Sequence, residues 1–143
     1  MENRNILLID DDRDFVLSTK TFLEGRGYNV DTAGNGTEGW EKIKAGKPAL
    51  VVLDIMMDYD AEGFNLAYKL RQDDSRRETP IIIVSGFSKH LSEKMKDFEF
   101  VLGQDWPADA YFEKPIDLKE LAKSVEKFIP KTGDNITAGQ TNR

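Results

Sequence analysis

The stretch ILLIDDD, residues 6–12, joins four aliphatic residues directly to three aspartates. Four consecutive apolar residues with no alternating polar positions are typical of a parallel strand that is covered on both faces. Carboxylates gathered at the end of such a strand repel one another, and this repulsion requires a compensating positive charge. The stretch therefore predicts a buried strand over 5–10 and, where it ends, an acidic site that binds a cation.

Strands and helices alternate along the rest of the chain. Further strands are predicted at 28–33, 49–54, 80–85 and 109–115, and helices at 11–27, 37–46, 62–71 and 117–128. The strand at 28–33 is the most polar, and we expect it nearer an edge of the sheet. Short connections through helices require parallel strands and right-handed crossovers, so the order of elements predicts an α/β fold with a five-stranded parallel sheet.

Residues that end or begin helices support these boundaries. Gly25 and Gly27 follow the first helix, and Gly46 is a plausible stop for the second. Asp117 with Glu120 resembles a capping box at the start of the last helix. Each predicted helix is therefore short and has a defined end.

Composition limits what the protein can be. The chain has 143 residues, 39% hydrophobic and 32% charged, which fits one ordinary globular domain. The absence of cysteine excludes disulfides and zinc–thiolate sites, and a single histidine excludes a multi-histidine metal site. A formal net charge of −6 argues against direct binding of nucleic acid.

Hydropathy along the chain bears on location and order. No apolar stretch is long enough to cross a membrane, and the start lacks the long apolar core of a signal peptide, so we expect a cytoplasmic protein with no membrane partner. Residues 131–143 contain one large aliphatic side chain, Ile136. We therefore expect a folded domain over 1–130 and a disordered tail over 131–143.

Polar side chains stand where the predicted strands end. Asp10 and Asp11 follow the first strand, Asp54 ends the third, Ser85 ends the fourth, and Lys114 follows the fifth. Ligands of open α/β sheets bind just beyond the carboxyl ends of the strands. We therefore expect all five side chains at one edge of the sheet.

The residue types at this edge indicate phosphoryl transfer. Mg²⁺ takes oxygen ligands and is commonly held by carboxylates together with phosphate oxygens. Lys114 supplies a positive charge for an anionic ligand, and Ser85 supplies a hydroxyl donor. An aspartate can itself accept a phosphoryl group and form an aspartyl phosphate. The sequence thus predicts a Mg²⁺ site beside an aspartate that accepts a phosphoryl group.

Four motifs in order resemble the receiver domain of two-component response regulators. They are ILLIDDD (6–12), LVVLDIMMD (50–58), PIIIVSG (80–86) and YFEKP (111–115). The resemblance covers about 5–129. It implies a flavodoxin-like, doubly wound five-stranded parallel sheet, (βα)5, with strand order 2-1-3-4-5.

The resemblance assigns a role to each matching position. Asp54 matches the phospho-acceptor and also a metal ligand. Asp10, Asp11 and the main-chain carbonyl of Met56 match the other Mg²⁺ ligands.

The remaining matches concern the phosphoryl group and its consequences. Ser85 and Lys114 match residues that bind the phosphoryl group, and Tyr111 matches an aromatic that changes position together with Ser85. The Lys114–Pro115 peptide bond is expected to be cis, as in the family.

The resemblance also implies partners. Receivers take the phosphoryl group from a phosphohistidine of a sensor histidine kinase or a histidine phosphotransfer protein, and do not turn over an external substrate. A downstream protein is expected at the surface formed by the fourth helix, the fifth strand and the fifth helix. The segment 86–109 looks long for that region. Because the chain ends soon after the last helix, we expect a stand-alone receiver.

Two alternatives stay open. Small phosphatases of the haloacid-dehalogenase type also carry Asp-x-Asp after an apolar strand, as in Asp10 and Asp12, but Asp14 stands where they usually have Thr or Val. A receiver fold could also act only as an interaction module that is never phosphorylated. Asp58, where receivers often have proline, keeps that alternative open, although the complete group of site residues argues against it.

Overall fold

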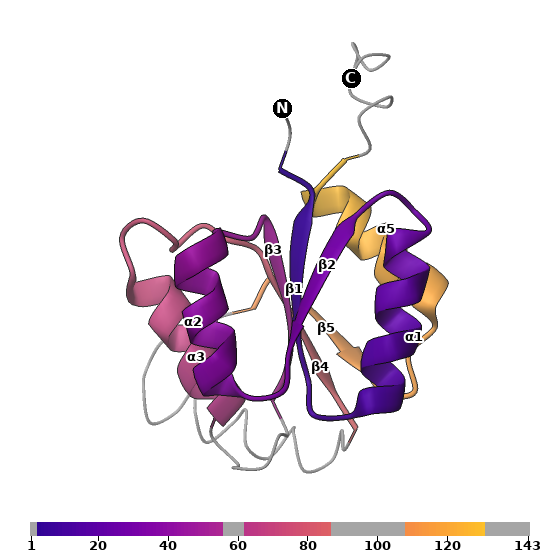
Figure 1. Ribbon diagram of the computed structural model, residues 1–143, viewed down its shortest axis with the longest axis horizontal. Helices are drawn as coiled ribbons and strands as arrows, with labels where there is room; N and C mark the ends of the chain where they lie inside the picture. Colours follow the sequence, from indigo (N-terminus) through magenta and orange to yellow (C-terminus); the bar gives the residue numbers. More distant parts are fainter. Residues whose placement is uncertain (1–2, 56–61, 87–107, 131–143) are drawn as a thin grey trace.

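A five-stranded sheet with helices on both faces forms the molecule (Figure 1). The computed structural model describes residues 3–55, 62–86 and 108–130. Each strand and helix within these ranges was predicted, with boundaries that differ by a few residues at most. The elements in order are β1 (Asn5–Ile9), α1 (Arg13–Glu24), β2 (Asn29–Ala33), α2 (Gly36–Gly46), β3 (Leu50–Asp54), α3 (Glu62–Gln72), β4 (Ile81–Ser85), β5 (Ala110–Glu113) and α5 (Leu118–Phe128).

The sheet has the strand order β2-β1-β3-β4-β5, and all four neighbouring pairs are parallel. The order confirms the flavodoxin-like arrangement, and the polar strand β2 lies at an edge as predicted. The strand β2 lies on one side of β1, and the next strand in sequence, β3, lies on its other side. The carboxyl ends of β1 and β3 are therefore neighbours near the centre of the sheet. This is the position where open α/β sheets bind ligands.

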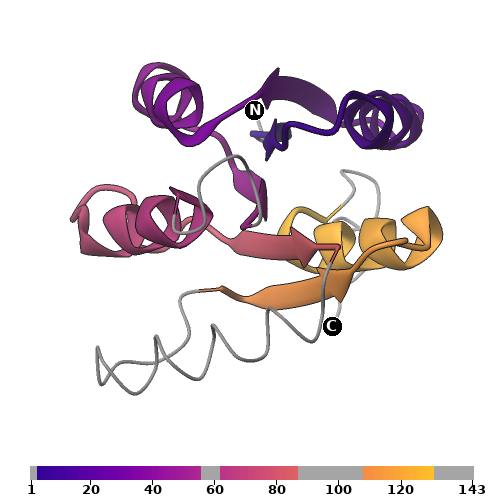
Figure 2. The ribbon, with the colours of Figure 1, turned by 90° about the horizontal axis from the view of Figure 1, so that it is seen from below.

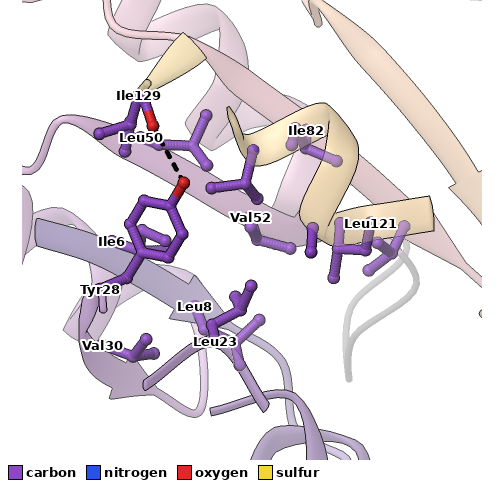
Figure 3. Close-up of a cluster of buried hydrophobic side chains, with 13 residues drawn as sticks. Ile6, Leu8, Leu23, Tyr28, Val30, Leu50, Val52, Ile82, Leu121 and Ile129 are labelled. Atoms are coloured by element: carbon purple, nitrogen blue, oxygen red, sulfur yellow. Dashed lines mark hydrogen bonds between the residues drawn. The ribbon is translucent and has the colours of Figure 1, made fainter. Parts of the chain in front are cut away.

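Helices α2 and α3 cover one face of the sheet, and α1 and α5 cover the other (Figures 1 and 2). Successive strand residues point to opposite faces, so β1 sends Leu7 and Ile9 toward α2 and α3, and Ile6 and Leu8 toward α1 and α5. Both faces are therefore buried, which explains the unbroken apolar runs. The core under α1 and α5 is drawn in Figure 3 and consists of Ile6, Leu8, Leu23, Tyr28, Val30, Leu50, Val52, Ile82, Val84, Leu121, Ala122, Val125 and Ile129.

Two predicted helix ends differ in detail from the expectation. Helix α2 ends at Gly46, but the left-handed residue that follows is Lys47, with φ 46°. At the start of α5, the Asp117 carboxylate accepts from the Lys119 N–H at 2.9 Å. The Glu120 carboxylate lies 3.3 Å from Lys123 Nζ, so the reciprocal half of the predicted capping box is replaced by an ion pair one turn along the helix.

Several expectations fall on residues outside those described. They concern the carbonyl of Met56, the substitution at Asp58, the region of the fourth helix within 87–107, and the tail at 131–143. Among the described residues, no helix is long and apolar enough to cross a membrane.

Candidate functional site

The predicted site residues meet at the carboxyl ends of the central strands. Asp10 directly follows β1, Asp54 is the last residue of β3, and Ser85 is the last residue of β4. The parallel register pairs Asp54 with Val84, and Ser85 with the last residue of β5, so Lys114 comes one residue beyond that pair. The placement follows from the topology, because parallel strands present their carboxyl ends at one edge.

Three carboxylates form a compact cluster at this edge. Asp10, Asp11 and Asp54 each offer an oxygen, and these oxygens all lie within 4.8 Å of one another. Asp10 and Asp54 are buried, with exposed fractions of 2% and 3%, whereas Asp11 is exposed. Oxygen ligands of an octahedral Mg²⁺ stand about 3–4 Å apart. The donor types and their spacing therefore fit a Mg²⁺ ion that is open to solvent on the Asp11 side.

Lys114 is the cation that faces this cluster. Its Nζ lies 2.9 Å from Asp10 Oδ2, 3.7 Å from Asp54 Oδ2 and 3.9 Å from Asp12 Oδ2. Burial alone would lower the pKa of Lys114. The close contact and charge of Asp10, added to the charges of the two other aspartates, outweigh burial and raise that pKa above its ordinary value. Lys114 is therefore held as a cation beside the carboxylates.

Hydrogen bonds donated by backbone N–H groups fix the loop that follows β1. The Asp10 N–H donates to the carbonyl of Ala33 at 3.0 Å, which extends the pairing of β1 with β2 by one residue. Asp10 Oδ1 accepts from the Asp12 N–H at 2.9 Å, and Asp12 Oδ1 accepts from the Phe15 N–H at 3.1 Å. Asp12 is thus the N-cap of α1. The acidic run turns sharply into the helix and leaves the Asp10 and Asp11 side chains at the strand-end edge.

The end of β3 is closely backed by the first turn of α3. A Cβ added at Gly63 would lie 2.7 Å from the carbonyl oxygen of Asp54 and 2.5 Å from the Cα of Ile55. Only a residue without a side chain permits this approach. Gly63 therefore determines how closely α3 packs behind the backbone of Asp54.

Ser85 and Lys114 are joined through the backbone. The Ser85 side chain is fully buried, and its carbonyl accepts from the Lys114 N–H at 2.6 Å. The Lys114–Pro115 peptide bond is cis, as expected. The backbone thus fixes Ser85 at the end of β4 next to Lys114, whose ammonium contacts the carboxylate cluster.

Tyr111 lies two residues before Glu113, the β5 partner of Ser85. Its side chain is half-buried and packs against the core under α2 and α3. Burial, assisted by the negative charge of Glu113, raises the pKa of Tyr111 above its ordinary value. The hydroxyl is buried and has no hydrogen-bond partner among the described residues. The predicted movement of the Tyr111 side chain together with Ser85 stays a prediction.

Sequence reasoning missed two residues of the site and understated a third. Lys114 Nζ lies 4.4 Å from the centre of the Phe15 ring, and Gly63 backs Asp54 as described above. Asp12 was considered only in the phosphatase alternative, but its Oδ2 lies 3.9 Å from Lys114 Nζ. The place of Phe15 in the first turn of α1, directly after the aspartates, is a signal that could have indicated its proximity to the site. The contact of Gly63 depends on the packing of α3 and has no such signal.

Comparison with known proteins decides the family. The model of the response regulator receiver domain matches residues 6–126 of this chain. The chain belongs to the response regulator receiver family. Receivers of this family bind Mg²⁺ at an acidic cluster, take phosphoryl groups from sensor kinases, and serve in signalling rather than in substrate turnover. The match gives no support to the phosphatase or to the interaction-module alternative.

Curated relatives support this assignment. The response regulator Rre1 of Synechocystis sp. is 31% identical over 136 residues, and the alkaline phosphatase synthesis transcriptional regulatory protein PhoP of Bacillus subtilis is 32% identical over 130 residues. The matches cover 94% and 91% of this receiver but only 55% and 50% of those proteins. This chain thus spans about half the length of the curated relatives that it matches.

Solved receiver structures have the same fold. A CheY-like receiver from Methanospirillum hungatei is 31% identical, with a TM-score of 0.73, and the match covers 93% of this chain and 99% of that one. The response regulator TrrA from Thermotoga maritima, solved in complex with Mg²⁺ and BeF, is 30% identical, with a TM-score of 0.71 and coverage of 87% and 98%. The described strands and helices of this chain therefore have the arrangement of a receiver domain.

Proposed function

We propose that this receiver accepts a phosphoryl group on Asp54 from a phosphohistidine of a sensor histidine kinase or a histidine phosphotransfer protein. The cluster of Asp10, Asp11 and Asp54 within 4.8 Å, with Lys114 Nζ 2.9 Å from Asp10, is the observation that carries the proposal. Such a cluster destabilises the fold unless a cation compensates it, and Mg²⁺ fits the donor atoms.

In this mechanism Asp54 is the nucleophile. One of its oxygens forms the new O–P bond as the N–P bond of the phosphohistidine breaks, and the electron pair of that bond returns to the imidazole. Lys114 supplies positive charge to the phosphoryl oxygens, and the hydroxyl of Ser85 donates to one of them. Bound Mg²⁺ would neutralise charge on both the carboxylates and the phosphoryl group.

Asp10 and Asp11 are proposed as ligands of that Mg²⁺ together with Asp54. The carbonyl of Met56, outside the described residues, is proposed as a further ligand on the resemblance alone. Tyr111 is proposed to change position with Ser85 after phosphorylation and so to alter the surface of β5 and α5, where a downstream protein binds. The cytoplasmic location expected from the sequence stays a prediction.

Intact mass spectrometry after incubation with acetyl phosphate and Mg²⁺ tests the proposal. We expect the mass of one phosphoryl group to be added to the wild-type protein. Asp54→Asn and a wild-type sample treated with a chelator should gain none. Asp74→Asn is the matched control, because Asp74 is an exposed carboxylate outside the site that pairs with Arg77, and it should be modified like the wild type.

Two results would contradict the proposal. If Asp54→Asn were still modified, the acceptor would be another residue. If the wild-type protein bound Mg²⁺ and gained no mass from acetyl phosphate or from a phosphorylated histidine donor, the fold would act as an interaction module without phosphoryl chemistry.

A further inference from the structure

We infer that Phe15 is a positioning residue for Lys114: the face of its ring holds the lysine ammonium at the carboxylate cluster. Lys114 Nζ lies 4.4 Å from the centre of the Phe15 ring. A cation at this distance is attracted by the negative charge density of an aromatic face. The inference rests on the proposed function, since it assigns a second determinant to the lysine that would bind the phosphoryl group.

The ring itself is firmly placed. Phe15 is half-buried and packs against the core under α1 and α5. Its backbone N–H donates to Asp12 Oδ1, the N-cap of α1, at 3.1 Å. Because the cap and the core fix the first turn of α1, the ring is a rigid surface against which the flexible lysine stem is held.

Among the described residues, the ion-pair partners of the ammonium are three aspartates. Asp10 is in direct contact at 2.9 Å, and Asp54 at 3.7 Å and Asp12 at 3.9 Å lie beyond ordinary hydrogen-bond distance. Of these contacts, only the one with the ring involves no group that could also bind a divalent cation. When Mg²⁺ shares the carboxylate charge, the attraction of those carboxylates for Lys114 weakens, whereas the attraction of the ring does not change. Phe15 therefore matters most once the metal is bound.

Substitutions at Phe15 separate the effect of the aromatic face on Lys114 from the effect of apolar bulk. Phe15→Leu keeps an apolar side chain but removes the face, and we expect the rate of phosphorylation by acetyl phosphate to fall about three- to thirtyfold, from the strength of a partly desolvated cation–π contact. Phe15→Tyr and Phe15→Trp keep the face, and each should restore most of the rate. Mg²⁺ affinity should change little in all three variants, because the ring is not a ligand.

Phe22 provides a matched control on the same helix. It packs against the same core, and Arg26 lies 4.9 Å from the centre of its ring, but neither residue belongs to the site. Phe22→Leu thus removes an equivalent aromatic and an equivalent cation–π contact. We expect it to lower stability by a similar amount and to leave the phosphorylation rate at the wild-type value.

NMR of the Lys114 side chain gives a readout that is independent of phosphorylation. Ring current from Phe15 should shift the Lys114 Hε resonances upfield in the Mg²⁺-loaded wild-type protein, and this shift should disappear in Phe15→Leu and persist in Phe22→Leu. Hε resonances without an upfield shift, or equal phosphorylation rates in Phe15→Leu and wild type, would overturn the inference. If the wild-type protein were not phosphorylated at all, the proposed function would fail, while the ring-current measurement would still decide whether Phe15 holds Lys114.

Discussion

At the scale of single residues, the site depends on groups that carry no chemistry of their own. The strand-end rule placed Asp10, Asp54 and Lys114 correctly, because it follows from topology alone. It could not place Gly63, whose missing side chain allows α3 to approach the carbonyl oxygen of Asp54 and the Cα of Ile55. In the sequence, a glycine inside a predicted helix indicates only a slightly less stable helix. The packing of α3 against the end of β3 shows that glycine is required at this position.

Gly63→Ala should therefore disturb the acceptor. Added bulk against a rigid backbone cannot be relieved by a side-chain rotation, so we expect unfolding free energy to fall by about 1–3 kcal/mol. The displaced backbone of Asp54 should also lower Mg²⁺ affinity. Urea unfolding and a Mg²⁺ titration measure the two effects.

Gly46→Ala is the control for this substitution. It is also a helical glycine, but a Cβ there would meet nothing within 4 Å. We expect it to be neutral or to stabilise by up to about 1 kcal/mol, without any change in Mg²⁺ affinity. Equal effects at the two positions would show that the close approach of α3 is unimportant.

At the scale of elements, side chains of the neighbouring helices α1 and α2 occupy backbone carbonyls at the free edge of β2. Lys20 from α1 donates to the carbonyl of Val30 at 2.5 Å, and Lys42 from α2 donates to the carbonyl of Thr32 at 2.6 Å. The Thr32 N–H donates to Asp31 Oδ1 at 2.8 Å. These are backbone groups on the side of β2 away from β1, which is where another strand could pair.

The polar composition of β2 predicted an edge position, and that prediction is confirmed. The lysines that protect the edge were not predicted. Their role depends on how α1 and α2 lie beside the strand, and in the sequence a lysine on a helix reads as an ordinary solvent-facing charge. Periodicity therefore identified the elements, while the contacts between elements required the structure.

Replacing both lysines by methionine should expose the edge of β2. Methionine keeps the apolar stem but removes the donor, so Lys20→Met with Lys42→Met leaves two carbonyls available to a strand of a second molecule. We expect concentration-dependent self-association in sedimentation velocity, and a stability loss of about 1 kcal/mol per lost hydrogen bond. Lys44→Met with Lys123→Met changes the net charge equally at exposed positions away from the edge, and should sediment like the wild-type protein. Self-association of both double variants would mean that lost charge, rather than the opened edge, is responsible.

At the scale of the whole molecule, contacts near the two ends of the fold join the start of β1 to the end of α5. The Tyr28 hydroxyl donates to the carbonyl of Ile129 at 2.9 Å, across 101 positions of sequence (Figure 3). Arg4 donates to the carbonyls of Gly27 and Pro130, both at 2.9 Å, and its guanidinium lies 4.4 Å from the centre of the Tyr28 ring. These contacts hold α5 in place after its last turn.

The order of motifs predicted the complete sheet, including the central position of β1 and β3. It did not predict this closure, by which we mean the contacts of Arg4 and Tyr28 with the residues after α5. A hydrogen bond between residues so distant in sequence leaves no local pattern. The same reason explains why Phe15 and Lys114 were not paired from the sequence.

Tyr28→Phe isolates the hydrogen bond of this closure, because the ring and its contact with Arg4 remain. Loss of the donor leaves the buried carbonyl of Ile129 unpaired, and we expect unfolding free energy at pH 7 to fall by about 1–2 kcal/mol. Burial raises the pKa of Tyr28 above its ordinary value of 10.0, against the opposing charge of Arg4. Above pH 10 the unfolded chain therefore ionises first, and the wild-type protein loses stability as pH rises toward the folded pKa.

The phenylalanine variant lacks this loss. The difference in unfolding free energy between wild type and Tyr28→Phe should therefore narrow as pH rises above 10. Urea unfolding of both proteins across this range measures it. A difference that stays constant would show that Tyr28 ionises equally in the folded and unfolded chains.

The closure also has a practical consequence for how this receiver can be handled. Because all strands are parallel, the start of β1 and the end of α5 lie at the opposite end of the sheet from Asp54, about 16 Å away along a five-residue strand (Figure 1). A linker joined near Asn5 or Ile129 would leave from the side remote from the acceptor. A molecule tethered to a sensor chip at either position should thus present its carboxylates to solution. The association and dissociation rates of a kinase can then be measured on the same chip surface before and after phosphorylation.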